Sequence, residues 1–170
     1  MDFLRPDASY PNLASVPWSA YREHFDYLFL DADNTLQVHG RTEASPAAKA
    51  MVDTLQSLGF KVILYSNASP ERAKGLAQSL DIELLAKANK PSPKALNEFI
   101  KEKAWDPDRV LVVGDQLFTD LWAGQRAKVK TLHVKPISKD EAWWIKPKRW
   151  LEHCFIKKWG ETDGFDDLLS

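Results

Sequence analysis

The stretch YLFLDADNTL, residues 27–36, decides the predicted fold. Four apolar residues form a short strand that runs directly into Asp31, and a second carboxylate follows at Asp33. Apolar runs of this length are typical of strands buried in parallel sheets, and such sheets bind ligands beyond the carboxyl ends of their strands. Asp and Asn also favour plain turns. Two carboxylates directly after a buried apolar strand are energetically costly, however, and a turn alone does not explain them. We therefore expect chemistry at this strand end.

Outward from this strand, short apolar runs alternate with helix-length amphipathic stretches, which is the pattern of successive βαβ units. Ser45 precedes one such helix as a plausible N-cap, and Gly59 is placed to end it. The prediction is an α/β fold, a three-layer sandwich around a parallel sheet of about five strands. The expected strands are 27–30, 61–65, 82–86, 110–113 and 130–134, and the expected helices are 46–58, 69–80, 93–103 and 119–128.

The length of 170 residues suits one domain with a continuous core. We expect residues 26–136 to form that core. Residues 1–25 are expected to wrap it or to contribute a helix near 19–24, and residues 137–170 to form a basic, Trp-rich helical tail that packs on it.

Composition limits the partners. The 23 basic and 24 acidic side chains leave a formal charge of −1, so no global field recruits nucleic acid, and we expect none as a partner. The single cysteine, Cys154, cannot form an internal disulfide, which favours a reducing cytoplasm. The sequence has no apolar stretch of the roughly 18 residues that a membrane span needs.

Polar residues follow four successive predicted strands, where the carboxyl ends of parallel strands meet at one edge. Any one of them has an ordinary explanation as a turn residue, a helix cap or a solvated lysine. Their convergence indicates a site. They are Asp31 and Asp33 after the first strand, Ser66 and Asn67 after the second, Lys90 after the third, and Asp115 with Asp120 after the fourth.

These residues resemble, in order, the four motifs of the haloacid dehalogenase (HAD) phosphatases: Asp-x-Asp-x-Thr-Leu, Ser-Asn, Lys-Pro and Gly-Asp-x-x-x-x-Asp. More narrowly, the chain resembles the YqeG family of small HAD phosphatases, through residues 30–36, 114–120 and 134–137. The resemblance implies a HAD-like, Rossmannoid sandwich. The intervals from Asp31 to Ser66 and from Ser66 to Lys90 leave no room for a separate cap domain beside the expected helices.

The resemblance also implies roles. Asp31 is the expected nucleophile and Asp33 the expected general acid and base. Ser66, Asn67 and Lys90 are expected to bind the phosphate group. Mg²⁺ would be held by Asp31, the backbone carbonyl of Asp33 and Asp115, and Asp120 would support the metal ligands from behind.

The YqeG family is similar to phosphatidylglycerophosphate phosphatases of mitochondria and plastids, which implies a phospholipid head-group phosphate as substrate. A protein, nucleic-acid or small-molecule phosphate is the alternative, and so is a HAD-fold binding protein without a catalytic role. Four tryptophans of the tail, Trp143, Trp144, Trp150 and Trp159, lie among lysines and an arginine. This suits peripheral contact with the cytoplasmic membrane face, although the same residues would also serve to pack the tail onto the core.

Overall fold

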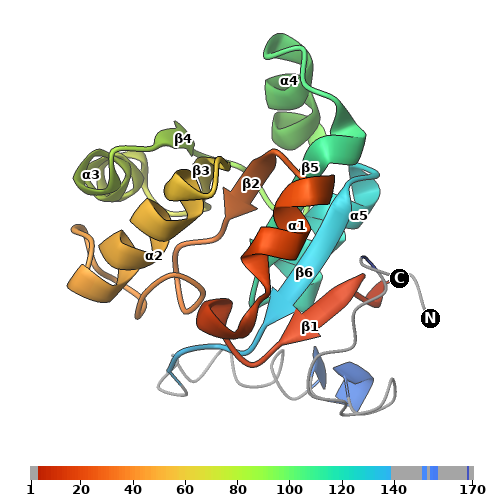
Figure 1. Cartoon of the computed structure of the whole chain (residues 1–170), viewed down its shortest axis with the longest axis horizontal. Coiled ribbons are helices and arrows are strands. Elements are labelled where there is room, and N and C mark those ends of the chain that lie inside the picture. Colours follow the sequence, from red (N-terminus) through yellow and green to blue (C-terminus); the bar gives the residue numbers. More distant parts are fainter. Residues whose placement is uncertain (1–3, 139–150, 153, 157–167, 169–170) are drawn as a thin grey trace.

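A computed structural model describes residues 4–138, 151–152, 154–156 and 168. At its centre lies a six-stranded sheet with the order β1-β6-β5-β2-β3-β4, in which every pair is parallel (Figure 1). The chain runs from β2 outward to β4 and then returns to β5 on the other side of β2, so the strand order reverses between β2 and β5. Ligand crevices form at such a point. The strands are β1 (Ala8–Tyr10), β2 (Tyr27–Leu30), β3 (Lys61–Tyr65), β4 (Glu83–Leu85), β5 (Val110–Gly114) and β6 (Lys130–Val134).

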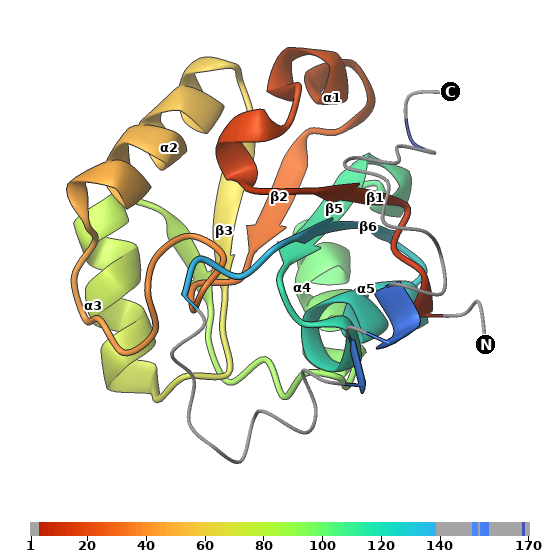
Figure 2. The same cartoon turned by 90° about the horizontal axis from the view of Figure 1, so that it is seen from below.

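Helices cover both faces of the sheet, with α1 and α2 on one face and α4 and α5 on the other (Figure 2). Ser45 is the N-cap of α2, as expected, and Ser69 is the N-cap of α3. The hydroxyl of each accepts from the backbone N–H three residues ahead. The α5 helix is preceded by a π-helical turn, η4 (Leu117–Leu121). The helices are α1 (Trp18–His24), α2 (Pro46–Ser57), α3 (Pro70–Leu80), α4 (Lys94–Glu102) and α5 (Trp122–Arg126).

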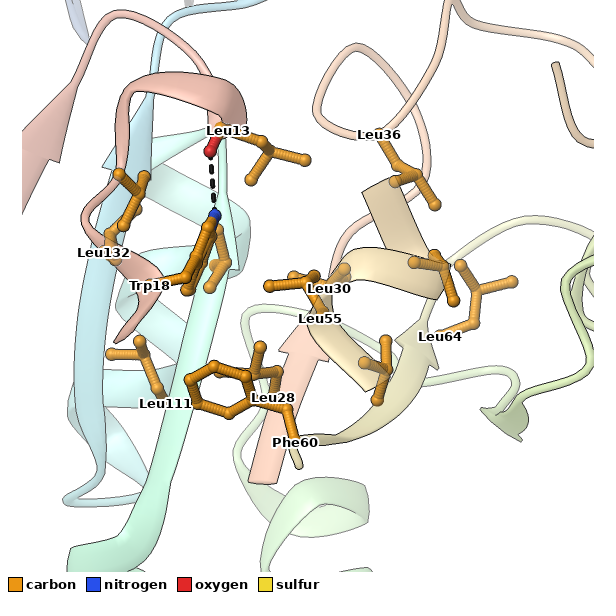
Figure 3. Packing of buried hydrophobic residues seen from close by; sticks show 14 of the residues in the cluster. Leu13, Trp18, Leu28, Leu30, Leu36, Leu55, Phe60, Leu64, Leu111 and Leu132 are labelled. Carbon is orange, nitrogen blue, oxygen red and sulfur yellow. Dashed lines mark hydrogen bonds between the residues drawn. The ribbon is translucent and has the colours of Figure 1, made fainter. Parts of the chain in front are cut away.

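The apolar core is divided by the sheet into two clusters, because alternate residues of a strand face opposite sides. Leu28 and Leu30 of β2 pack under α1, α2 and α3, whereas Phe29 between them packs toward α4 and α5. Figure 3 shows the first cluster, in which the Trp18 Nε1 donates to the Leu13 carbonyl oxygen at 2.8 Å. Full burial of each large apolar side chain contributes about 1.5–3 kcal/mol, so both clusters hold the sheet rigid beneath its carboxyl edge.

The sheet has six strands rather than about five, because residues 8–10 form an edge strand beside β6. Its register places Ala8 opposite Leu132, and the Ser9 hydroxyl lies 3.0 Å from Nδ1 of His133. A three-residue strand has too little periodicity to be recognised, and its partner lies more than a hundred residues away along the chain. The N-terminal segment therefore belongs to the sheet through β1 and to the core through α1, the helix expected near residues 19–24.

The other predictions of local structure hold closely. Strands β2, β3 and β6 have the expected bounds, and β4 is one residue shorter at each end. The 14 residues from Ala32 to Ser45 contain no helix, and their one bridge joins Asp33 to Gln37. No cap domain is present in the described chain. Its helices are also too short, or too polar, to cross a membrane.

Candidate active site

The four strand ends bring their polar residues together at the carboxyl edge of the sheet. Asp31 follows β2 and Asp115 follows β5, so these two carboxylates flank the point where the strand order reverses. The backbone N–H of Asp31 donates to the Val113 carbonyl oxygen at 3.0 Å, which continues the pairing of the two strands into the site. Asp31, Asp115, Asp120 and Lys90 are all buried. Buried charged groups of this density need partners, and they find them in one another.

Lys90 is the centre of the cluster. Its ammonium group donates to Asp31 Oδ1 at 2.6 Å, to Asp120 Oδ1 at 2.6 Å and to the Tyr65 carbonyl oxygen at 2.9 Å. These three bonds use all three of its protons. The same group lies 4.7 Å from the centroid of the Tyr65 ring. Lys90 therefore neutralises part of the carboxylate charge and fixes the distance between Asp31 and Asp120.

Asn67 holds the backbone of Lys90 at both sides. The Lys90 N–H donates to Asn67 Oδ1 at 2.9 Å, and Asn67 Nδ2 donates to the Lys90 carbonyl oxygen at 3.0 Å. The side chain that was expected to bind phosphate thus positions Lys90 in this structure, and its contact with phosphate stays a prediction. The buried Ser66 hydroxyl accepts from the Ala68 N–H at 3.0 Å and keeps its own proton for an anion.

Asp31, Asp115 and Asp120 form an acidic cluster in which the nearest carboxylate oxygens all lie within 4.8 Å of one another. The Thr35 hydroxyl donates to Asp115 at 3.2 Å, and the Gln116 N–H donates to Asp120 at 3.1 Å. Gly114 permits this approach, because a Cβ at that position would lie 2.5 Å from the Asp120 Cβ. The glycine of the Gly-Asp motif therefore makes room for the aspartate that follows it six residues later.

Burial raises the pKa of Asp31 well above its ordinary value, and the charges of Asp120 and Asp115 raise it further against the opposing effect of Lys90. Burial by itself would lower the pKa of Lys90, but the Asp120 and Asp31 carboxylates outweigh it, and the pKa of Lys90 is raised above its ordinary value. The cationic form of Lys90 is thus favoured, while burial and the neighbouring carboxylates oppose ionisation of Asp31.

The cluster fits a divalent cation. Asp31 Oδ2 is buried and has no hydrogen-bond partner among the described residues, and Asp31 and Asp120 share the single ammonium group of Lys90. A hard cation with oxygen ligands would satisfy that atom and the excess charge, and it would lower the pKa of Asp31. Asp31 and Asp115, two of the expected metal ligands, both belong to this cluster, and their binding of a metal stays a prediction. Asp120 lies in the same cluster, although Lys90 and Gln116 already occupy its two oxygens.

Asp33 lies outside this cluster. Its Oδ2 is paired with the Arg72 guanidinium and lies 3.3 Å from Nδ1 of His39, and its Oδ1 accepts from the Gly40 N–H at 3.2 Å. Arg72 belongs to the first turn of α3 and is the site residue that sequence reasoning missed. The only available signal was its place in the helix that follows the Ser66-Asn67 strand end, since such a helix begins at the same edge of the sheet.

The described part of the C-terminal tail contacts the loop that carries Asp120. Phe155 lies edge-on against Phe118 of η4, with 5.8 Å between ring centroids, and the buried Glu152 accepts from the Phe118 N–H at 3.3 Å. Membrane contact through the tail stays a prediction. The residues on which it rests, Trp143, Trp144, Trp150 and Trp159, lie outside the described residues.

Known proteins similar to this chain are phosphatases or have the same fold. A family model described as haloacid dehalogenase-like hydrolase matches residues 7–128. The probable phosphatase YqeG of Bacillus subtilis is 28% identical over 155 residues, which cover 91% of this chain and 90% of that protein. The chloroplastic phosphatidylglycerophosphate phosphatase 1 of Chlamydomonas reinhardtii is 28% identical over 165 residues, covering 91% of this chain and 61% of that protein.

Among solved structures, an uncharacterized protein from Listeria monocytogenes serotype 4b has a similar fold, with a TM-score of 0.57 at 17% identity. The match covers 79% of this chain and 99% of that one. At this identity the likeness concerns the fold alone.

Proposed function

The chain belongs to the haloacid dehalogenase-like hydrolases and is a phosphatase of that family, and on this basis we propose that it hydrolyses phosphate monoesters through an aspartyl-phosphate at Asp31. The observation that carries the proposal is the buried contact of Asp31 with Lys90, beside Asp115 and Asp120, where the strand order reverses. A carboxylate held by a cation at such a point suits attack on an anionic phosphoryl group.

The metal is proposed to be Mg²⁺, held by Asp31, Asp115 and the backbone carbonyl of Asp33. Bound there, it would neutralise phosphoryl charge that otherwise repels a carboxylate nucleophile. In this scheme Ser66 binds a phosphoryl oxygen, and Lys90 keeps Asp31 oriented through its 2.6 Å bond to Oδ1. Lys90 would bind a second phosphoryl oxygen by exchanging one of its three present hydrogen bonds for it.

Asp33 is proposed to transfer the proton in both steps. In the first step Asp31 attacks phosphorus, and Asp33 donates a proton to the departing alkoxide. In the second step Asp33, now a carboxylate, takes a proton from the water that attacks the aspartyl-phosphate and regenerates Asp31. A side chain with 22% of its surface exposed suits this role, because it is open to both the leaving group and water.

The substrate is proposed to be the head-group phosphate of a phospholipid, phosphatidylglycerophosphate. The similarity to the phosphatidylglycerophosphate phosphatase of Chlamydomonas supports this. The lack of a cap domain among the described residues also supports it, since an uncapped site admits a bulky substrate. This chain spans about three fifths of that relative, so the relative's activity as a whole does not transfer automatically. A cytoplasmic location with contact at the membrane face remains part of the proposal.

The test is release of phosphate from phosphatidylglycerophosphate in mixed micelles, with Mg²⁺ or with EDTA. Wild type is compared with Asp31→Asn and Asp33→Asn. The matched control is Asp53→Asn, which makes the same change at an exposed position of α2. We expect magnesium-dependent release that Asp31→Asn abolishes, that Asp33→Asn lowers by about 10²–10⁴-fold, and that the control retains.

The other outcomes separate the alternatives. If the lipid is untouched while p-nitrophenyl phosphate is hydrolysed, the lipid substrate is wrong and a protein, nucleic-acid or small-molecule phosphate takes its place. If the protein hydrolyses neither compound in the presence of any divalent cation, it is better described as a binding protein without a catalytic role.

A further inference from the structure

The charged groups at the carboxyl edge form two separate systems. The first is the buried cluster around Lys90. The second is centred on Asp33, whose carboxylate is bound by Arg72, by His39 and by the N–H of Gly40. His39 and Gly40 belong to the same exposed loop as Asp33, whereas Arg72 reaches the carboxylate from a different element, 39 residues further along the chain. Arg72 thus fixes Asp33 relative to the body of the domain.

Arg72 is itself well anchored. Its backbone N–H donates at 3.4 Å to the Ser69 hydroxyl that caps α3, and α3 packs on the sheet through Leu76, Ala77 and Leu80. The Arg72 side chain is only 21% exposed. An arginine–carboxylate pair that is mostly shielded from water orients its partner more strongly than a surface pair does, because the planar guanidinium has a fixed donor geometry.

The contacts of Asp33 differ between its two oxygens. Oδ2 is held by the Arg72 guanidinium and faces Nδ1 of His39. Oδ1 accepts a single bond from the Gly40 N–H, in an exposed loop, at 3.2 Å. Anchoring Oδ2 leaves Oδ1 as the oxygen that can give a proton to one partner and take it from another. Proton transfer requires such a group to lie within hydrogen-bond reach of the reacting oxygen.

We propose that Arg72 is a positioning residue that anchors Oδ2 of Asp33, so that Oδ1 is the oxygen that transfers the proton in phosphate-ester hydrolysis. This inference rests on the proposed function. In the first step the Asp31–phosphorus bond forms, the bond from phosphorus to the leaving oxygen breaks, and the proton on Oδ1 goes to that oxygen. In the second step water attacks phosphorus, its proton goes to Oδ1, and the Asp31–phosphorus bond breaks.

The experiment compares two substrates of similar size in the presence of Mg²⁺. Benzyl phosphate releases an alkoxide that needs a proton, and p-nitrophenyl phosphate releases a stable phenolate that does not. The value of kcat/KM reports the steps up to departure of the leaving group. Arg72→Ala should therefore lower kcat/KM about tenfold for benzyl phosphate, a part of the 10²–10⁴-fold that general acid catalysis supplies, and less than about twofold for p-nitrophenyl phosphate.

The second step is common to both substrates and needs Asp33 as a base. In Arg72→Ala, p-nitrophenol should therefore appear in a burst followed by a slower steady rate. Arg72→Lys should recover part of the kcat/KM for benzyl phosphate. Arg72→Ala should cause no further loss in an Asp33→Asn background, because there is no proton left to position. Lys74→Ala, which removes an exposed cation from the same helix, is the control. It should leave kcat/KM unchanged for both substrates.

The ratio of the two kcat/KM values is independent of the fraction of folded enzyme, so a loss of stability does not imitate the expected result. An unchanged ratio in both Arg72→Ala and Arg72→Lys would overturn the assignment, and an equal loss on both substrates would make Arg72 a phosphate-binding or structural residue. If wild type hydrolyses neither substrate, the proposed function itself fails, which is a different result from any of these.

Discussion

Strand β2 has an aspartate directly before it and another directly after it, and the two carboxylates differ in how far nearby cations neutralise them. Asp26 precedes the strand and forms a two-pronged pair with Arg109, whose Nε and Nη2 donate at 2.8 and 2.9 Å, and it also pairs with Arg22. Asp31 follows the strand and shares one ammonium group with Asp120. Asp26 therefore has two cationic partners, whereas Asp31 shares one cation with a second carboxylate.

The pKa values of the two aspartates are shifted in opposite directions. The hydrogen bond from Arg109 is the main reason that the pKa of Asp26 lies below its ordinary value, despite some burial. Burial is the main reason that the pKa of Asp31 lies well above its ordinary value. Charge that is fully paired stabilises a fold, whereas charge that is buried and under-compensated is costly and persists where a ligand or a reaction uses it.

The largest expected difference between the two aspartates is in activity. Asp31→Asn should lower phosphate release by at least about 10³-fold, because the amide cannot form the acyl phosphate. Asp26→Asn should keep the rate within about twofold, since Asp26 lies at the opposite end of β2 from the site. Steady-state phosphate release with Mg²⁺ measures both. A comparable loss in the two variants would mean that Asp31 has no special role.

The next effect concerns the cation that holds the site. Lys90→Met should lower the free energy of unfolding by about 3 kcal/mol in metal-free buffer at neutral pH, because it leaves Asp31 and Asp120 buried without their partner. Urea titration followed by circular dichroism measures it. Lys94→Met is the control. That side chain is 80% exposed and should change stability by no more than about 0.5 kcal/mol.

The two aspartates should also give opposite pH dependences in EDTA. Because the folded pKa of Asp31 is raised, its contribution to stability is full below about pH 3.9, the unfolded value, and is lost as the pH rises toward the folded pKa. The folded pKa of Asp26 is lowered, so its contribution is present above about pH 3.9 and is lost as the pH falls through the folded pKa.

Urea titrations between about pH 3 and pH 8 test this. Relative to wild type, Asp31→Asn should gain stability with rising pH, by about 1.4 kcal/mol for each unit that separates the folded and unfolded pKa values. Asp26→Asn should instead lose about 1 kcal/mol at neutral pH and approach wild type in acid. If the stability of both variants relative to wild type changed with pH in the same direction, the opposite pKa shifts of Asp31 and Asp26 would be contradicted.

The smallest expected effect is on stability and concerns Tyr65, which lies beside Lys90 in the site. The Tyr65 hydroxyl is buried and lacks a hydrogen-bond partner among the described residues, while the ring of Tyr65 lies over the Lys90 ammonium. Tyr65→Phe removes the unsatisfied hydroxyl and keeps the ring, so stability should stay equal or rise by up to about 1 kcal/mol. Tyr65→Leu, which also removes the ring, should be less stable than Tyr65→Phe in the same thermal melts. A destabilised Tyr65→Phe would show that the hydroxyl is satisfied in solution.

Much of this molecule was predictable from local sequence. Strands β2, β3 and β6 were assigned with their observed bounds, because short apolar runs flanked by turn residues are strong local signals. Ser45 was recognisable as a cap because capping depends on neighbours within one turn. The convergence of Asp31, Lys90 and Asp115 on one edge followed from strand direction alone, since every strand of a parallel sheet delivers its carboxyl end to the same side.

The remaining features depend on partners that are distant along the chain. Strand β1 is only three residues long and exists because β6 offers it an edge. The amide of Asn67 holds the backbone of Lys90, 23 residues away, a contact that the sequence did not indicate. The pairing of Arg72 with Asp33 requires the start of α3 to lie beside the loop after β2, which no local pattern specifies.

The sequence by itself therefore determined the elements, their order and the edge on which the polar residues meet, because these follow from the chemistry of neighbouring residues. Only the tertiary structure decided which charges are paired and which are left in excess. Asp26 and Asp31 are the same residue type at the two ends of one strand, and their sequence neighbours do not distinguish them in this respect. Burial and distant cations do, because the energy of a charge depends on the solvent and counter-charges around it in space.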